Sequence, residues 1–105
     1  MKMKYLLLSA DSIPSVYLVP EIVADNLDKY CNEFWDWMRT SPQADEYRVD
    51  LGGYSGLSYT EEDFIKYLNM WVFPDAPCRL VERLDGIWKR DDIPKKYEHC
   101  KWFNF

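Results

Sequence analysis

His99 and Cys100 are the one place in this sequence where a base and a soft nucleophile are adjacent. Thiol catalysis requires the two side chains to lie within hydrogen-bond reach of each other. The segment from Tyr97 to Phe105 is predicted to be a last strand, and adjacent residues on a strand point to opposite faces. We therefore expect a surface imidazole beside a buried thiol, and no catalytic pair.

A glycine-rich run at residues 52–56 reads Gly-Gly-Tyr-Ser-Gly and has the composition of two kinds of functional loop. A nucleophile elbow requires glycine two residues after the serine, and Leu57 occupies that position. A phosphate loop delivers its anion to the free amides of a helix N-terminus. Here Glu61, Glu62 and Asp63 fill the first turn of the next predicted helix and would repel phosphate. The run is predicted to be a plain surface loop.

Neighbouring carboxylates occur three times, as Asp45-Glu46, Glu61-Glu62 and Asp91-Asp92. All three pairs lie in polar sequence, where we expect them to be solvated. An acid-base pair is defined by the separation of its carboxylates in space, which sequence does not supply. A hard-cation site at Asp91-Asp92 would lack the regular alternation of an EF-hand loop. The sequence therefore predicts no catalytic residue, no metal ligand and no cofactor.

The three cysteines, Cys31, Cys78 and Cys100, are widely spaced, and the chain has one histidine. This spacing fits neither a disulfide framework nor a zinc site, so we expect free thiols and a cytoplasmic protein. The N-terminus imitates a signal peptide, but its apolar run from Tyr5 to Leu8 is shorter than a signal core and Asp11 follows it. We expect a first strand there, and no other run approaches the ~20 residues that cross a bilayer.

Composition predicts one globular domain over residues 1–105, because 48% of the residues are hydrophobic and 30% are charged. The aromatic share of 17% is more than a domain of this size can bury whole, so some rings should reach the surface. Residues 1–63 contain twelve acids and five bases, whereas residues 64–105 contain six and eight. The net charge of -5 argues against nucleic acid as a partner, and the acidic half could steer a basic protein.

Periodicity predicts strands near residues 3–9 and 16–19, followed by an amphipathic helix from Pro20 to about Arg39. The helical wheel places Trp35 and Trp37 on opposite shoulders of the apolar stripe, so at least one is a boundary residue. The predicted inner residues are Val23, Leu27, Tyr30, Cys31, Phe34 and Met38, and the predicted outer residues are Glu21, Asp25, Asp28, Lys29, Asn32 and Asp36.

A short strand is predicted at residues 47–51, and a second helix runs from a capping box at Thr60 and Asp63 to about Val72. Its apolar face is predicted to hold Phe64, Ile65, Leu68, Trp71 and Val72. A hairpin with an Asp85-Gly86 turn should join residues 79–84 to Ile87 and Trp88. In the last strand, Phe103 and Phe105 should dock on one face of the sheet. The fold class is α+β, with a mostly antiparallel sheet of four to six strands packed by two amphipathic helices.

Function is predicted from surface character alone. The leading hypothesis is a non-catalytic, protein-binding domain, of an interaction, immunity or inhibitor type, whose partner presents a basic surface. No membrane partner is expected, and the oligomeric state is not predicted. One alternative is a small-ligand or carbohydrate binder with an aromatic-lined pocket, and another is a small enzyme with carboxylate or thiol chemistry. The candidate interface residues are Glu21, Asp25, Asp28, Trp35, Asp36 and Trp37.

Overall fold

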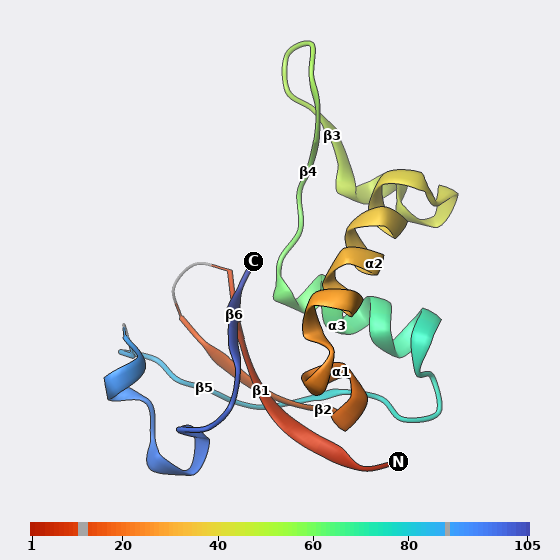
Figure 1. Ribbon diagram of the computed structural model, residues 1–105. Coiled ribbons are helices and arrows are strands. Elements are labelled where there is room, and N and C mark those ends of the chain that lie inside the picture. The colour runs from red at the N-terminus through yellow and green to blue at the C-terminus, as the bar shows by residue number, and fades with distance from the viewer. Residues whose placement is uncertain (11–12, 88) are drawn as a thin grey trace.

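The computed structural model describes residues 1–10, 13–87 and 89–105 of the chain, which combine strands with α-, 3-10 and π-helices (Figure 1). The elements in chain order are β1 (Met3–Ser9), β2 (Ser15–Pro20), α1 (Glu21–Asp25), α2 (Leu27–Thr40), the 3-10 helix η1 (Pro42–Tyr47), β3 (Arg48–Asp50), β4 (Ser55–Leu57), α3 (Glu61–Tyr67), the π-helix η2 (Leu68–Val72), β5 (Arg79–Arg83), the 3-10 helices η3 (Arg90–Asp92) and η4 (Lys95–Tyr97), and β6 (Trp102–Asn104).

The main sheet has four strands in the order β5-β2-β1-β6. Strand β2 pairs antiparallel with β1 and with β5, whereas β6 pairs parallel with β1. Strands β3 and β4 form a separate antiparallel hairpin, which projects away from the sheet beyond the end of α2 (Figure 1). The predicted α+β class and strand number are confirmed. The alternating pattern did not reveal that the last strand is parallel, because either direction presents the same alternation.

Both faces of the main sheet are covered, and strand β1 supplies residues to both. Leu6 and Leu8 belong to the larger core, which contains the inner residues of the helices. Leu7 points to the opposite face and belongs to a smaller core with Val16 and Tyr97. Successive strand residues alternate between faces, so a continuous apolar run is needed where both faces are buried. The apolar run near the N-terminus is therefore an inner strand, and its three leucines are fully buried.

The single helix predicted from Pro20 to Arg39 is wrong in one respect, because it is broken at Asn26. That residue has φ -127° and ψ 42°, and its side-chain amide donates to the Ile22 carbonyl at 2.9 Å. An asparagine side chain that bonds to nearby backbone competes with the helical hydrogen-bond ladder, which accounts for the break. The predicted inner residues are nevertheless all buried, and the predicted outer residues are exposed or half-buried.

Among the described residues, no strand follows the turn predicted at Asp85-Gly86 to complete a hairpin with residues 79–84. The turn itself forms, since Gly86 has φ 82° and the Ile87 amide donates to the Leu84 carbonyl at 3.3 Å. Strand β5 pairs with β2 instead, through an irregularity in register beside Val16, and the next described element is η3. Trp88 lies outside the described residues. The turn forms as the Asp85-Gly86 signal indicates, but Ile87, which follows it, is not in a strand, and β5 stays at the edge of the sheet.

Two shorter segments differ from their predicted structure. The residues from Tyr97 to Lys101 form the end of η4 and a turn, so His99 and Cys100 are not on a strand. Likewise Tyr47 ends η1, and only Arg48–Asp50 is extended. The glycine-rich run is the tip of the β3–β4 hairpin and part of β4, and Gly52 and Gly53 have φ of 69° and 104°. These angles favour glycine, which is why the pair marks a tight turn.

The C-terminal strand docks as predicted. Phe103 and Phe105 both pack against the larger core, with their ring centroids 4.9 Å apart in an edge-to-face contact. Ser9 Oγ donates to Asn104 Oδ1 at 2.7 Å, and the Phe105 amide donates to the Ser9 carbonyl at 2.7 Å. None of the helices in the described residues has the length and apolar character to cross a bilayer.

Candidate functional site

An aromatic groove lies where α2, η1 and the α3–η2 segment meet. Its volume is about 240 Å³. Two of its rings are buried and form the base, while the Trp71 and Met70 side chains are 49% and 62% exposed. The lining residues, which define the aromatic groove below, are Trp37, Gln43, Glu46, Tyr47, Lys66, Tyr67, Met70 and Trp71.

Trp37 is the centre of this groove, because it touches each of the other three rings. The centroid of its ring lies 5.9 Å from that of Tyr47, 5.1 Å from that of Tyr67 and 6.1 Å from that of Trp71. The interplanar angles are between 44° and 54°, so none of the three pairs is stacked in parallel. Trp37 lies on the shoulder of the α2 apolar stripe, as the helical wheel predicted, and is half-buried.

Trp71 is presented by the π-helical turn η2. The Phe73 amide donates to the Leu68 carbonyl, five residues earlier, at 2.7 Å. A π-turn accommodates an extra residue and rotates the side chains that follow it, compared with an α-helix. The prediction that Trp71 shares the buried face of Phe64 and Leu68 is therefore wrong. Asn69 anchors the turn by accepting from the Cys78 amide at 2.6 Å and donating to its carbonyl at 3.1 Å.

One carboxylate, Glu46, lines the aromatic groove, and two others lie near its buried tyrosines. Burial raises the pKa of Tyr47 to about 12, and the nearby Asp63 and Glu46 carboxylates add to the rise. Burial also raises the pKa of Tyr67, with Glu33 as the next cause. Within the part of the chain that the structure describes, neither Glu33 nor Glu46 has a basic side chain at ion-pair distance. Their charges are therefore available to an external cation.

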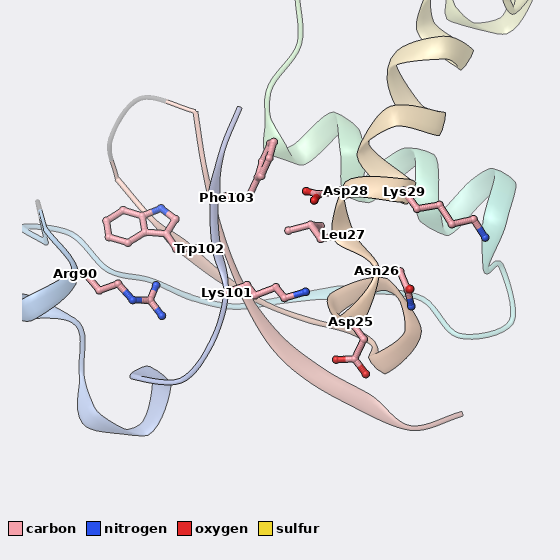
Figure 2. Close-up of a pocket in the computed structure, with 9 residues that line it drawn as sticks. All are labelled: Asp25, Asn26, Leu27, Asp28, Lys29, Arg90, Lys101, Trp102 and Phe103. Atoms are coloured by element: carbon pink, nitrogen blue, oxygen red, sulfur yellow. The ribbon is translucent and has the colours of Figure 1, made fainter.

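A second hollow, the charged cleft, lies between the α1–α2 junction and the segment that leads into β6. Its volume is about 610 Å³; the helical wall carries Asp25, Asp28 and Lys29, and the opposite wall carries Arg90 and Lys101. Figure 2 shows the Lys101 side chain reaching from the C-terminal segment towards Leu27 and the helical wall. Arg90 is committed to the backbone, because its guanidinium donates to the carbonyls of Glu98 and Cys100 at 3.3 and 2.5 Å. The lining residues are Asp25, Asn26, Leu27, Asp28, Lys29, Arg90, Lys101, Trp102 and Phe103.

The structure distributes the acids of the predicted interface over several places. Glu21, Asp25 and Asp36 each face a base of this chain: Lys2 at 4.0 Å, Lys4 at 2.7 Å and Arg39 at 3.1 Å respectively. These pairs are exposed and contribute little to stability, but they partly neutralise the acids towards a partner. Asp28 lines the charged cleft and has no basic group at ion-pair distance among the described residues.

The two predicted tryptophans lie on opposite sides of α2. The Trp35 indole N–H donates to the Tyr59 hydroxyl at 2.9 Å, and its ring lies 6.3 Å from that of Phe103. Trp35 is therefore held by contacts within the chain, whereas Trp37 lines the aromatic groove. The structure brings Trp37 together with Tyr67 and Trp71, and it does not bring the six predicted residues into one patch.

The cysteines and His99 do not form a reactive pair. Burial raises the pKa of Cys31 to about 12 and that of Cys78 to about 11, so both thiols are protonated at neutral pH. A protonated thiol is a poor nucleophile and a poor metal ligand. The His99 side chain is 94% exposed, and its Nε2 lies 3.3 Å from Glu98 Oε1. Cys100 is half-buried against the smaller core. The strand argument for separating His99 and Cys100 was wrong, because the pair lies on a turn.

One of the paired carboxylates is not solvated. Glu61 is 6% exposed, although its neighbour Glu62 is exposed. It follows Thr60, whose amide donates to Asp63 Oδ2 at 2.8 Å, and this bond holds the first turn of α3. A helix start turns successive residues through about 100°, so adjacent carboxylates can differ completely in burial. Among the described residues, no cluster of three or more potential metal-ligating side chains occurs.

Sequence reasoning missed Trp71, Met70 and Glu46 as groove residues. Trp71 was placed on the buried face because a uniform α-helical period was assumed, and nothing in the local composition indicates a π-turn. The high aromatic content did indicate that some rings reach the surface. Comparison with protein-family models, curated proteins and solved structures finds no match to this chain.

Proposed function

We propose that this chain is a non-catalytic, protein-binding domain that binds a basic segment of its partner at the aromatic groove. The observation that carries the proposal is the half-exposed Trp71, which lies against Trp37 in a groove that Glu46 lines. Glu33 lies near Tyr67, at the base of the groove. Aromatic anchors in a partly desolvated setting supply binding energy, and surrounding charge supplies steering and selectivity. The three free cysteines suit a reducing compartment such as the cytoplasm.

The outer face of α2 extends the proposed surface away from the groove. Asp28, Glu33 and Asp36 are all exposed on this helix. Asp36 is paired with Arg39, so Asp28 and Glu33, which have no basic side chain at ion-pair distance among the described residues, supply most of the field on this face. That field would attract a basic partner before contact and weaken in salt. An inhibitor or immunity-type role is compatible with such a surface, as it is with the net charge.

Photo-crosslinking tests the proposal at the groove itself. A photoreactive phenylalanine replaces Met70, which is 62% exposed at the lip of the groove, and the domain is irradiated in a native lysate. The matched control places the same group at Tyr54, which is 75% exposed on the distant β3–β4 hairpin. We expect one stoichiometric protein adduct from position 70, reduced by added salt and absent from position 54. Equal labelling from both positions, or no stoichiometric adduct, would overturn the proposal.

Neither the aromatic groove nor the charged cleft fits the small-ligand alternative as well as the aromatic groove fits the protein-binding proposal. Sites for small molecules generally measure ~300–1,000 Å³ and are lined mainly by apolar groups. The aromatic groove has the lining but only about 240 Å³. The charged cleft has about 610 Å³, but its apolar lining is confined to Leu27, Trp102 and Phe103. Tryptophan fluorescence across a ligand panel, repeated with Trp102→Phe and Trp71→Phe, separates the two hollows.

A further inference from the structure

The aromatic groove has room for one side chain. Its volume of about 240 Å³ lies below the ~300 Å³ at which sites for small molecules begin. A peptide helix or an extended strand would have to lie across the opening, with a single residue inserted. What the groove selects in a partner is therefore the chemistry of one inserted side chain.

The walls of the groove favour a flat or alkylated cation. The faces of aromatic rings carry partial negative charge and attract a cation placed over them. Two cation–π contacts occur among the described residues, Lys29 over Tyr30 and Lys96 over Tyr97, and neither involves a ring of the groove. The faces of Trp37 and Trp71, tilted at 44° to each other, thus have no such contact with a cation of the described chain.

The charges at the groove select the same class of ligand. Glu46 lines the groove, so a cation on the Trp71 ring would find a carboxylate within the same hollow, and Glu33 lies outside the lining, near Tyr67. A nucleobase could stack on the same rings, but its phosphate would meet these carboxylates. Lys66 is the opposing charge, because it also lines the groove and repels a bound cation. Its removal should therefore strengthen binding.

Arginine fits these walls better than lysine. The guanidinium is planar and weakly hydrated, stacks on indole faces and donates two parallel hydrogen bonds to a carboxylate. The lysine ammonium is a strongly hydrated point charge and forfeits more solvation when it enters a groove of this size.

We propose that the aromatic groove receives one arginine side chain of a basic partner segment, with the guanidinium on the exposed part of the Trp71 ring beside Trp37 and paired with Glu46. This inference rests on the proposed function, and names the partner chemistry that the groove recognises. Trp71 serves as the outer wall of the site and Glu46 as its counter-ion.

Short capped peptides test the inference directly. Gly-Arg-Gly, Gly-Lys-Gly and Gly-citrulline-Gly, the last a neutral isostere of the arginine peptide, are titrated to millimolar concentration while the indole N–H signals are followed by NMR. We expect the arginine peptide to shift the Trp37 and Trp71 signals saturably, the lysine peptide to bind less tightly and citrulline to give no shift. Equal binding of citrulline, or shifts confined to Trp102 in the charged cleft, would overturn the inference.

Substitutions in the groove test which residues bind the arginine side chain. Trp71→Ala should weaken arginine binding roughly tenfold and Glu46→Gln by several-fold, whereas Lys66→Gln should strengthen it. Tyr54→Ala is the matched control at an exposed ring and should change nothing. Glu46 and Lys66 are exposed, so their variants should keep the parent melting temperature. Trp71→Ala removes the ring contact with Trp37 and should lower the melting temperature by roughly 5 °C, so its affinity is measured well below that temperature. Unchanged affinity in Glu46→Gln and Lys66→Gln would overturn the assigned geometry.

The inference and the proposed function can fail separately. If position 70 captures a stoichiometric protein but the arginine peptide gives no shift, the inference is overturned and the proposed function is retained. If the peptide binds as described but no protein is captured, the arginine site is retained and the protein-binding proposal is overturned.

Discussion

Deleting the last three residues should lower the stability of this domain by about 4 kcal/mol. The two lost phenylalanines are half-buried, and each contributes roughly 1 kcal/mol from apolar burial. Phe105 also meets the rings of Phe34, Phe64 and Phe103 at centroid distances of 6.4, 5.3 and 4.9 Å. These three contacts share one ring and are not additive, so together they add about 1 kcal/mol beyond area. The lost hydrogen bonds to Ser9 add about 1 kcal/mol.

Thermal unfolding followed by circular dichroism measures this loss. For a domain of this length, 1 kcal/mol corresponds to roughly 4–8 °C, so the melting temperature should fall by about 15–30 °C. The double substitution Phe103→Ala and Phe105→Ala removes both rings but keeps the backbone pairing of β6 with β1. This variant should be more stable than the truncated chain, but by less than half of the stability that truncation removes. A fall of less than about 5 °C in the truncated chain would refute the packing argument.

Three further outcomes follow from individual contacts. The pKa of Glu82 is lowered from its ordinary value of 4.5, first by the hydrogen bond from Tyr97 and then by Lys96. The ionised Glu82 carboxylate therefore stabilises the folded state at neutral pH, and this contribution is lost as the pH falls through the pKa of Glu82 in the folded state. The free energy of unfolding, measured by urea titration, should fall less steeply below about pH 4.5 in Glu82→Gln than in the parent. Parallel plots of this free energy against pH for the two proteins would contradict the prediction. With a thiol reagent at neutral pH, the half-buried Cys100 should react first, with Cys31 and Cys78 reacting only on unfolding; rapid labelling of all three would show that the core opens. Deleting Met70 should return η2 to an α-helical period and turn Trp71 towards the core. Acrylamide quenching of the Trp71 fluorescence, obtained by comparison with Trp71→Phe in each background, should therefore fall. Unchanged quenching would mean that the π-turn does not set the exposure of Trp71.

Features that depend on local pattern were predictable from the sequence. The inner face of α2, the strand near the N-terminus and the docking of Phe105 all follow from hydrophobic periodicity, which reports burial directly. Strand partners were not predictable in the same way. β5 has the alternation of a hairpin strand, yet pairs with β2, because pairing is decided by competition among distant segments.

The candidate site was only half predictable for a related reason. Trp37 appeared as a boundary residue because α2 is regular around it, but Trp71 appeared as a core residue because η2 is not regular. A π-turn changes which side chains face outward without a change in composition, so no count of apolar residues detects it. Glu46 entered only as one of several solvated carboxylates, since its distance from the rings is a tertiary property.

Two departures from regular helical structure lie beside the charged cleft and the aromatic groove. The helix break at Asn26 lines the charged cleft, and the π-turn presents Met70 and Trp71 to the aromatic groove. A regular helix over residues 61–72 would bring Trp71 towards Phe64 and Leu68 and gain apolar burial, so the π-turn leaves part of the hydrophobic free energy of Trp71 unused. Irregular turns and exposed aromatic residues that forgo such stabilisation are concentrated at functional sites. The exposed half of the Trp71 ring is therefore the feature of this fold that core packing explains least and that binding an external side chain explains best.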